Sequence, residues 1–384
     1  MRAGRVQEHA MSRSLLKHWW RASPQTLRLL FCAGLCLLRA RKRFQDAAGG
    51  EPLFVCGAFC NASGLAQGAR LYAEACRQQG RQAHLLDITG VVCMPRDLEP
   101  AEPLLTVADA AAMRGPGTVI IHANPPQFQL ALCALGKEFL RDKRVVGYWV
   151  WELEAFPPVW KHALAYVDAV EVPSVFVADA LRRCTRKPVT ARPHAVPAPR
   201  RRKSRYAADG VLRCLYVFDA GSSWGRKNPQ AALDAFVRAF KPGEAELTFK
   251  ISNEGADPER FARFQAACVA TPGVRILTGS LAPEAMEELY LRHDVYLSLH
   301  RSEGFGLTIL EALRHGLHVV ATGWSGNMDF MTGEMAHAVP CALTPVRMRS
   351  GPYKGCRARW AEPDVEAAAK ILRELHQELT AANA

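Results

Sequence analysis

The stretch DVYLSLHRSEGFGLTILEALRHGLHVVATG, residues 294–323, holds two apolar runs on either side of a segment with helical periodicity. The runs DVYLSL and HVVATG are short and almost continuously apolar, which is typical of strands buried on both faces of a sheet. Between them, TILEALRHG predicts a helix that ends near Gly316. A strand, a helix and a second strand in this order predict two parallel strands joined by a crossover helix.

The same alternation extends through most of the chain. From residue 52 onward, runs such as LFVCGAFC and GTVIIHAN alternate with helical segments. The alternation stops at HAVPAPRRRKSRYAADG and resumes at VLRCLYVFD. We therefore predict an α/β fold with two Rossmann-like doubly wound domains facing a central cleft, where ligands bind at the carboxyl ends of the strands. The predicted parts are a basic N-terminal extension (1–50), an N-terminal Rossmann-like domain (51–198), a basic linker (199–210), a C-terminal Rossmann-like domain (211–362) and a C-terminal helix that could pack back across the hinge (363–384).

The net charge of +12 is concentrated in two segments of the 384 residues. Residues 1–50 hold ten Lys and Arg against two acids, and PRRRKSR, residues 199–205, holds five basic residues and no acid. These two segments account for the whole positive excess, so the folded body is not basic. No basic stripe with interleaved aromatic residues lies on it, and we therefore exclude nucleic-acid binding as the function.

Residues 1–50 contain one apolar run, from Leu29 to Leu38. A membrane-spanning helix needs about 20 apolar residues, so this run is too short. It also lacks the small-residue cleavage site of a secretory signal. Its basic flanks and the HWW at residues 18–20 favour a helix lying at a membrane surface, with an ordinary docking helix or a disordered leader as alternatives. We expect a cytoplasmic protein with peripheral contact to the inner membrane face through residues 1–50.

The twelve cysteines lie among apolar neighbours and form no CxxC pair. Cys56 and Cys60 are four residues apart, but no histidine stands at zinc-finger spacing from them. We therefore expect buried or free thiols in a reducing compartment and no zinc site.

Two acids, Glu303 and Glu311, stand eight positions apart around a Gly-Phe-Gly turn. The spacing alone is a weak signal, and the glycines strengthen it. Gly304 and Gly306 allow the backbone to approach a ligand closely, and the N–H groups at the start of the following helix offer an anion site. A loop acid, a phosphate cradle and a helix acid in series match a sugar, a diphosphate and a ribose.

The stretch FDAGSSWGRKNPQAALDAF predicts a strand, a polar loop and a helix with Pro229 in its first turn. Arg226 and Lys227 are then expected at the N-terminus of that helix. Cations oppose the helix dipole there, so helix stability does not favour them. A bound phosphate would be attracted by both the dipole and the cations. Solvated surface charges are the alternative.

In the first half, polar residues follow the predicted strands. The loop around Gly64 does not fit the GxGxxG spacing of nicotinamide enzymes, but it could face a ligand. His122 and Asn124 end the strand TVIIHAN, where a neutral imidazole could bond a sugar hydroxyl; a structural histidine is equally compatible. We expect Trp149, Trp151 and Glu152 on one face of the strand RVVGYWVWE. There they would either contact an acceptor or pack in the core.

Four motifs in order resemble the retaining GT-B glycosyltransferases of family 4, which use nucleotide sugars. The resemblance covers about residues 52–378. The motifs are HRSEGFGLTILEALRHGLHVVATGWSGNMDF, which contains the Glu-x7-Glu signature, FDAGSSWGRKNP, GYWVWELEAFP with VPSVFVADAL, and WAEPD.

The resemblance implies a role for each candidate residue. Lys227, with Arg226 beside it, would bind the diphosphate, Glu303 would lie near the transferred sugar, and Glu311 would bind the ribose hydroxyls. Backbone amides of Phe305, Gly306 and Leu307 would face the phosphates, and the base would lie near ISNEG, which contains Asn253. In the first half, Gly64, Asn124, Trp151 and Glu152 would serve the acceptor, with His122 facing the reacting centre.

The expected function is therefore retaining transfer of a hexose-type sugar from a nucleotide-diphosphate sugar to a glycan or lipid-linked acceptor, in bacterial surface polysaccharide assembly. The resemblance implies no metal and no other cofactor. Two departures stand out: Arg226 and Lys227 are contiguous, where the family separates them, and HANPP replaces a doubled histidine. The alternatives are a sugar-nucleotide epimerase, a dehydrogenase, or a nucleotide-sugar binding protein without turnover.

Overall fold

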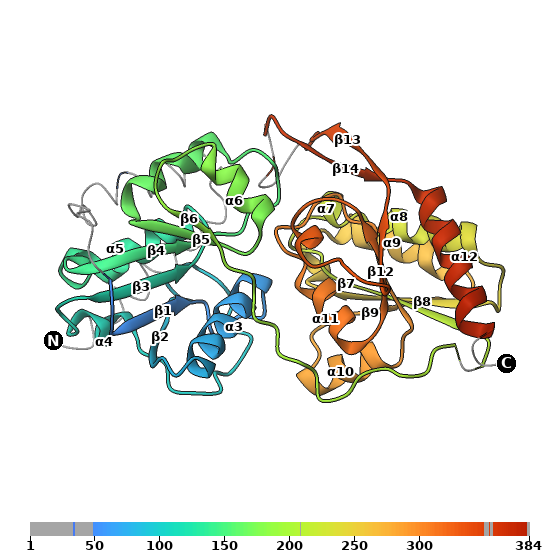
Figure 1. The fold of residues 1–384 in the computed structure, drawn as a ribbon, viewed down its shortest axis with the longest axis horizontal. Helices are drawn as coiled ribbons and strands as arrows, with labels where there is room; N and C mark the ends of the chain where they lie inside the picture. Colours follow the sequence, from blue (N-terminus) through green and yellow to red (C-terminus); the bar gives the residue numbers. More distant parts are fainter. Residues whose placement is uncertain (1–33, 35–48, 208, 349–352, 354–355, 382–384) are drawn as a thin grey trace. The chain divides into compact units, whose positions relative to one another are not determined.

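The computed structural model describes residues 34, 49–207, 209–348, 353 and 356–381 (Figure 1). The predicted extension, 1–50, lies almost wholly outside the described residues. The chain divides into two compact units. The N-terminal unit contains residues up to 150, 156–172 and 181–195, and the C-terminal unit contains residues 151–155, 173–180 and 196–384. Within the described ranges, no helix combines the length and the apolar character needed to cross a membrane.

The N-terminal unit is built on a six-stranded parallel sheet in the order β2-β1-β3-β4-β5-β6. Its central strands are continuously apolar because both faces are covered. The strands are β1 Leu53–Gly57, β2 Ala83–Asp87, β3 Gly117–His122, β4 Lys143–Tyr148, β5 Ala169–Val172 and β6 Val189–Ala191.

The helices of this unit lie on the two faces of the sheet. The crossover through α3 runs from β1 outward to β2, whereas the crossover through α5 runs from β3 to β4 in the other direction. Right-handed crossovers therefore place α3 and α5 on opposite faces. The helices are α3 Gly64–Gln78, α4 Val107–Ala111, α5 Gln127–Leu140 and the 3₁₀ helix η1 Pro158–Tyr166; α6, Val175–Arg182, follows β5 in the chain, and its residues 175–180 group with the C-terminal unit.

The strand predicted over RVVGYWVWE is shorter than expected. Strand β4 ends at Tyr148, so Trp149, Trp151 and Glu152 do not share a strand face. Just beyond β4, the Trp149 N–H still donates to the Glu171 carbonyl of β5, and the Val150 N–H donates to the Asn124 side-chain oxygen at 2.7 Å. The expected grouping was wrong even for a strand, because Trp151 and Glu152 are adjacent and adjacent side chains of a strand point to opposite faces.

The C-terminal unit has a second six-stranded parallel sheet in the order β12-β11-β10-β7-β8-β9. The stretch 294–323 forms β10, α11 and β11, and the predicted parallel pair is confirmed by the register Val295 to His318. The strands are β7 Leu212–Asp219, β8 Ala245–Ser252, β9 Val274–Leu277, β10 Val295–Ser298, β11 His318–Thr322 and β12 Ala336–Val339. A separate antiparallel pair joins β13 Cys341–Pro345 and β14 Arg359–Pro363.

The helices of the C-terminal unit also lie on both faces of its sheet. The path β7-β8-β9 places α8 and α9 on one face, and the reverse path from β10 to β11 places α11 on the other. The helices are α7 Trp224–Lys227, α8 Pro229–Ala239, α9 Pro258–Val269, α10 Pro283–Leu291, α11 Leu307–His315 and α12 Val365–Ala381, with 3₁₀ turns η2 Glu254–Ala256 and η3 Gly326–Asp329.

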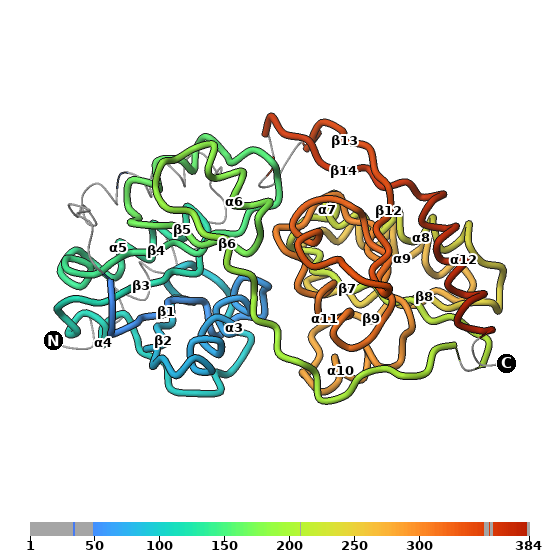
Figure 2. Tube along the Cα trace, viewed as in Figure 1, coloured from blue at the N-terminus to red at the C-terminus, as the bar shows by residue number. Residues whose placement is uncertain are grey.

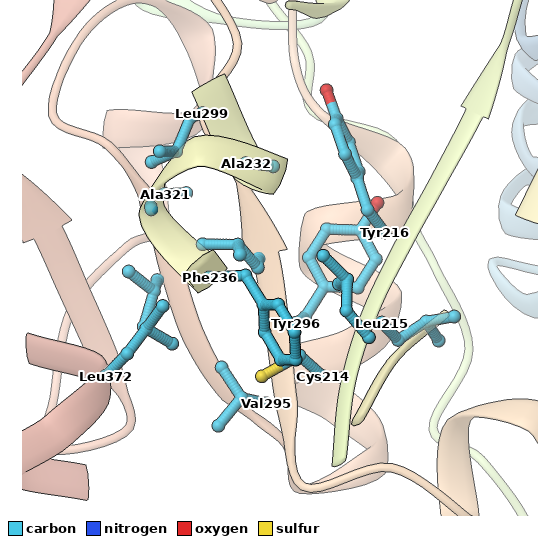
Figure 3. Close-up of a cluster of buried hydrophobic side chains, with 14 of the residues drawn as sticks. Cys214, Leu215, Tyr216, Ala232, Phe236, Val295, Tyr296, Leu299, Ala321 and Leu372 are labelled. Atoms are coloured by element: carbon cyan, nitrogen blue, oxygen red, sulfur yellow. The ribbon is translucent and has the colours of Figure 1, made fainter. Parts of the chain in front are cut away.

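The core of this unit lies between β7, β10 and the helices over them, as Figure 3 shows around Tyr216, Tyr296 and Phe236. Leu372 of α12 reaches the same cluster, and α12 packs on α8. The apolar face of the C-terminal helix is therefore buried within the C-terminal unit, and its burial needs no contact across the hinge.

The described residues of the basic segment 199–210 contain no helix or strand, and they run along the C-terminal unit before β7 (Figure 2). Lys203 forms an ion pair with the buried Asp294 at 2.9 Å, and its N–H donates to the His315 carbonyl. Tyr206 donates to the Gly316 carbonyl. Part of the positive charge of residues 199–205 therefore serves to attach this segment to the C-terminal unit.

Candidate active site

Four of the predicted donor residues lie in the connections that follow the carboxyl ends of three neighbouring strands. Lys227 and Arg226 follow β7, Asn253 follows β8, and Glu303 follows β10. Since β8, β7 and β10 are adjacent in the parallel sheet, these loops emerge at one edge. The topology therefore brings together residues up to 77 positions apart in the sequence.

A buried ionic cluster forms the centre of this edge. Arg226 Nη1 lies 3.0 Å from Glu303 Oε2, and Lys227 Nζ lies 2.5 Å from Glu303 Oε1. Glu152 adds a second carboxylate, 3.8 Å from Arg226 Nη2. Two cations and two carboxylates thus balance, which allows charged groups to be buried together.

The two cations are held differently. Arg226 is 3% exposed, and its guanidinium donates to the Ser302 carbonyl at 2.8 Å and to Ser222 Oγ at 2.5 Å. Lys227 is more exposed, and Glu303 is the one partner that its ammonium contacts among the described residues. Arg226 is therefore fixed in place, whereas Lys227 can exchange its partner by rotating its side chain.

The cluster sets the charge state of Glu303. Burial alone would raise the pKa of this carboxyl, but Arg226 and Lys227 outweigh burial and lower its pKa to about 2. Burial would also lower the pKa of Arg226, and Glu303 instead holds that pKa above its ordinary value. Glu303 is consequently a carboxylate at any physiological pH.

The prediction that Arg226 and Lys227 lie at the N-terminus of the helix from Pro229 is wrong. They form the last turn of a separate short helix, α7, and Asn228 then adopts a left-handed conformation (φ +50°) before α8 begins. The Ser223 side chain caps α7 by accepting the Arg226 N–H. Because both cations lie at the C-terminal end of α7, the helix dipole does not oppose them.

The glycine turn opens α11 as expected. Gly306 is the residue before the helix, with φ +93°, and no side chain caps the N-terminal N–H groups. Residues other than glycine rarely adopt this conformation. Phe305 is buried against Phe330, and Leu307 is the first helical residue. The uncapped start of α11 therefore presents backbone N–H groups beside Glu303.

Glu311 lies one turn into α11, half-buried, and accepts a hydrogen bond from the Tyr290 hydroxyl at 2.9 Å. Burial raises the pKa of this carboxyl to about 7, although the Tyr290 hydrogen bond opposes the rise. The two acids of the signature therefore differ in charge state: Glu303 is ionised, and Glu311 is partly protonated near neutral pH.

Sequence reasoning did not assign a role to Ser325 and Asn327, which support Glu303. The Glu303 N–H donates to Ser325 Oγ at 2.7 Å, and Asn327 contacts the buried His300 at 3.1 Å. Ser325 has φ +80°, and a Cβ on Gly326 would lie 2.2 Å from the Gly304 carbonyl oxygen. The signal was present as WSGN after β11, at the same edge of the sheet.

Asn253 lies in the neighbouring loop, which follows β8. It has φ +55°, and its side-chain amide donates to Asp219 Oδ1 at 3.0 Å. The same oxygen accepts the Gly221 N–H at 2.7 Å. The geometry gives Asn253 a structural contact, and its predicted donor role stays a prediction.

In the N-terminal unit, His122 ends β3 and is buried between Tyr148, whose ring stacks at 4.3 Å, and Tyr72. Both ring nitrogens lack a hydrogen-bond partner among the described residues. Burial, assisted by His194, lowers the pKa of His122 well below its ordinary value, so the ring is neutral. The neutral ring is 2% exposed and both of its nitrogens are buried, so the geometry does not support the predicted sugar contact, which stays a prediction.

Two further acceptor candidates belong to this unit. Gly64 is exposed as the first residue of α3, and Ser63 caps the helix. Asn124 lies close after β3, and its oxygen is used by Val150. The structure thus gives Asn124 a local role and leaves the Gly64 backbone accessible.

Trp151 and Glu152 group with the C-terminal unit. Trp151 is buried, donates its indole N–H to the Ala155 carbonyl and packs at 5.5 Å from Tyr353. Glu152 lies beside Arg226, and its carbonyl accepts the Ser302 hydroxyl. Both residues therefore contribute to the ionic cluster and its packing, a role that the sequence did not indicate.

Comparison with known proteins matches this part of the chain to a family. Residues 217–344, about a third of the chain, match the model of glycosyl transferases group 1. The GtfA subunit of UDP-N-acetylglucosamine–peptide N-acetylglucosaminyltransferase from Streptococcus agalactiae is 32% identical over 91 residues. The match covers 23% of this chain and 17% of that protein.

Solved structures share the fold. Anabaena Alr3699/HepE, determined with UDP and glucose, superposes with a TM-score of 0.59 at 12% identity, over 86% of this chain and 94% of that one. A glycosyltransferase from Rickettsia africae superposes with a TM-score of 0.50 at 12% identity, over 86% and 93% of the two chains. The predicted fold class, two parallel α/β sheets as in the GT-B glycosyltransferases, is confirmed.

Proposed function

We propose that this protein is a retaining glycosyltransferase that moves a hexose-type sugar from a nucleotide-diphosphate sugar to a glycan or lipid-linked acceptor. The observation that carries the proposal is the contact of Arg226 and Lys227 with Glu303, next to the uncapped start of α11. The match of residues 217–344 to glycosyl transferases group 1 supports it.

Donor binding exchanges the partner of Lys227. In the structure its ammonium pairs with Glu303, and a diphosphate bound at the start of α11 offers a more highly charged partner. Lys227 then turns to the phosphate while Arg226, fixed by Ser302 and Ser222, keeps its contact with Glu303. The two contiguous cations therefore have different roles: Lys227 binds the phosphate, and Arg226 positions the Glu303 carboxylate.

Glu303 then lies between the cations and the donor sugar. Its low pKa keeps it an acceptor for sugar hydroxyls, and it does not serve as an acid. During transfer, negative charge develops on the departing phosphate, and Lys227 with the α11 amides stabilises that charge. No side chain is proposed as nucleophile; the acceptor attacks from the face of the leaving phosphate, which takes the proton.

Glu311 completes the donor site through the ribose. Its carboxyl lies one turn into α11 from the phosphate-binding amides, and the Tyr290 hydroxyl holds one of its oxygens. The ribose hydroxyls would donate to it. In the N-terminal unit, His122 and the Gly64 backbone would contact the acceptor side, and residues 1–50 would hold the enzyme at the inner membrane face in bacterial surface polysaccharide assembly.

The test is a panel of UDP, GDP and ADP sugars, first by thermal shift and then by transfer of labelled sugar to glycan and lipid-linked acceptors. We expect stabilisation by one nucleotide class, transfer that continues in EDTA, and a product with the anomeric configuration of the donor by NMR. Stabilisation by none of the sugars would refute donor binding. An epimerase would convert the sugar without an acceptor, and a binding protein would bind the donor without product.

A further inference from the structure

The turn that carries Glu303 is bonded to the segment that begins η3. The Glu303 N–H donates to Ser325 Oγ at 2.7 Å, and the Glu303 carbonyl accepts the Gly326 N–H at 2.9 Å. Both backbone polar groups of Glu303 are therefore bonded to two consecutive residues. Because the Cα–Cβ bond leaves the backbone between these two planar peptide groups, the same hydrogen bonds fix the direction of the Glu303 side chain.

Ser325 has a backbone conformation that residues with a side chain rarely adopt. Its φ of +80° and ψ of −156° lie in a region that is essentially restricted to glycine. Strain of this kind persists only where the surrounding contacts impose it, and it is concentrated at functional sites. A glycine at position 325 would adopt the same conformation without strain, so backbone geometry does not favour a serine there.

The Ser325 hydroxyl both accepts and donates a hydrogen bond. It accepts the Glu303 N–H, and it donates to Asn327 Oδ1 at 3.3 Å. Asn327 is fully buried, and its side-chain amide donates at 3.0 Å to the carbonyl of Thr322, the last residue of β11. Ser325 therefore connects the Glu303 backbone to the end of a buried strand, and a glycine has no group that could make this connection.

The next peptide of the turn is also held closely. The Gly304 carbonyl accepts the Ser174 hydroxyl at 2.7 Å, and a Cβ on Gly326 would lie 2.2 Å from that carbonyl oxygen. The turn therefore fits tightly against the segment that begins η3. Since α11 begins at Leu307, the position of the turn also sets where the uncapped N–H groups of that helix lie.

We propose that Ser325 is a positioning residue for sugar transfer, whose hydroxyl, kept in a strained backbone conformation, orients the Glu303 carboxylate toward the donor sugar. The inference rests on the proposed function, in which Glu303 contacts that sugar. Arg226 and Lys227 also hold the carboxylate, at 3.0 and 2.5 Å. Once Lys227 turns to the phosphate, Arg226 and the backbone contact with Ser325 remain to fix Glu303.

The test compares Ser325→Gly with Ser325→Ala, which both lack the hydroxyl but differ in backbone strain. Both variants should lower kcat about 10–100-fold, with the KM of the donor within about threefold of the wild type, because a displacement of about 1 Å in an active site costs up to about 10²-fold in rate. Ser325→Gly should have a higher Tm than Ser325→Ala, since only the glycine relieves the strain. A merely structural serine would make kcat follow the Tm, so that the glycine variant would be the more active of the two.

A second readout requires no donor. In urea unfolding, Glu303→Gln should lower the midpoint less in the Ser325→Gly background than in the wild-type background, because Glu303 is then no longer fixed against its cations. This comparison tests the positioning of Glu303 even if the wild type transfers no sugar, which would be the failure of the proposed function and not of this inference.

The matched control is Ala207→Gly, which also places a glycine where a residue with a side chain has a positive φ, here +41°. The Ala207 N–H donates at 3.1 Å to Asp294, which directly precedes β10, whereas Glu303 follows β10. The control therefore lies at the opposite end of that strand and should leave kcat unchanged. A wild-type kcat in Ser325→Gly would overturn the proposal. So would an equal effect of Glu303→Gln on the urea midpoint in both backgrounds.

Discussion

Replacing Glu303 by Gln should destabilise the protein, because it leaves Arg226 and Lys227 buried without their shared carboxylate. Glu303 is 8% exposed and contacts the two cations at 3.0 and 2.5 Å. Its pKa is about 2 instead of the ordinary 4.5. This difference corresponds to about 3 kcal/mol of stability at neutral pH. The loss agrees with the roughly 3–5 kcal/mol typical of a buried ion pair that has lost one partner.

The pH dependence of the free energy of unfolding gives a second test of the same ion pairs. The pKa of Glu303 is lower in the folded protein, so its contribution is present above pH 4.5 and is lost as pH falls through 4.5 toward 2. The difference in the free energy of unfolding between wild type and Glu303→Gln should therefore be about 1 kcal/mol smaller at pH 4 than at pH 7.

The assay is urea unfolding followed by circular dichroism, at pH 7 and pH 4. Glu366→Gln is the matched control, because it breaks the pair of Glu366 with Arg238, in which both side chains are about half exposed or more. Exposed pairs contribute at most about 1 kcal/mol. A loss for Glu303→Gln no larger than that of the control, or a difference that grows as pH falls, would refute the role assigned to the cluster.

Three more predictions concern the donor site. Lys227→Ala should lower kcat/KM for sugar transfer about 10²–10³-fold, as for one lost oxyanion donor, and initial rates at the wild-type level would contradict phosphate binding by Lys227. In the same rate assay, Glu303→Gln should mainly lower kcat and Glu311→Gln should mainly raise the KM of the donor; equal effects of both on both constants would contradict the separate roles. Burial raises the pKa of Glu311 to about 7, so ionising it costs stability as pH rises from 4.5 through 7. Glu311→Gln should therefore exceed the wild type in free energy of unfolding at pH 8, by roughly 2 kcal/mol after the partial exposure of the carboxyl is allowed for, and urea titrations should show the two converging near pH 4.

Much of the donor half could be predicted from local patterns. The strand, helix and strand of residues 294–323 occur where the periodicity placed them, and Gly306 and Gly316 have the positive φ angles that helix ends require (+93° and +86°). Pro229 begins α8 as expected. These features depend on neighbours within a few residues, and the chemistry of those neighbours is visible in the sequence.

The local patterns failed where a long-range contact decided the outcome. Strand β4 ends at Tyr148, and the Val150 N–H that follows is bonded to the side chain of Asn124, 26 residues earlier. Arg226 and Lys227 belong to α7 and not to the start of α8, because the left-handed Asn228 separates the two helices. Its side chain is held by the Leu299 carbonyl, 71 residues later.

The sequence by itself determined the fold class, the order of its strands and helices, and the residue types that a phosphate and a sugar would need. The tertiary structure alone decided how those residues share their charges. Glu303 pairs with both cations, Glu152 joins them, and Glu311 is left in a pocket that raises its pKa. The reason is physical: periodicity reports which face of an element is buried, whereas the pKa of a buried carboxyl depends on charges a few ångströms away that come from other strands of the sheet.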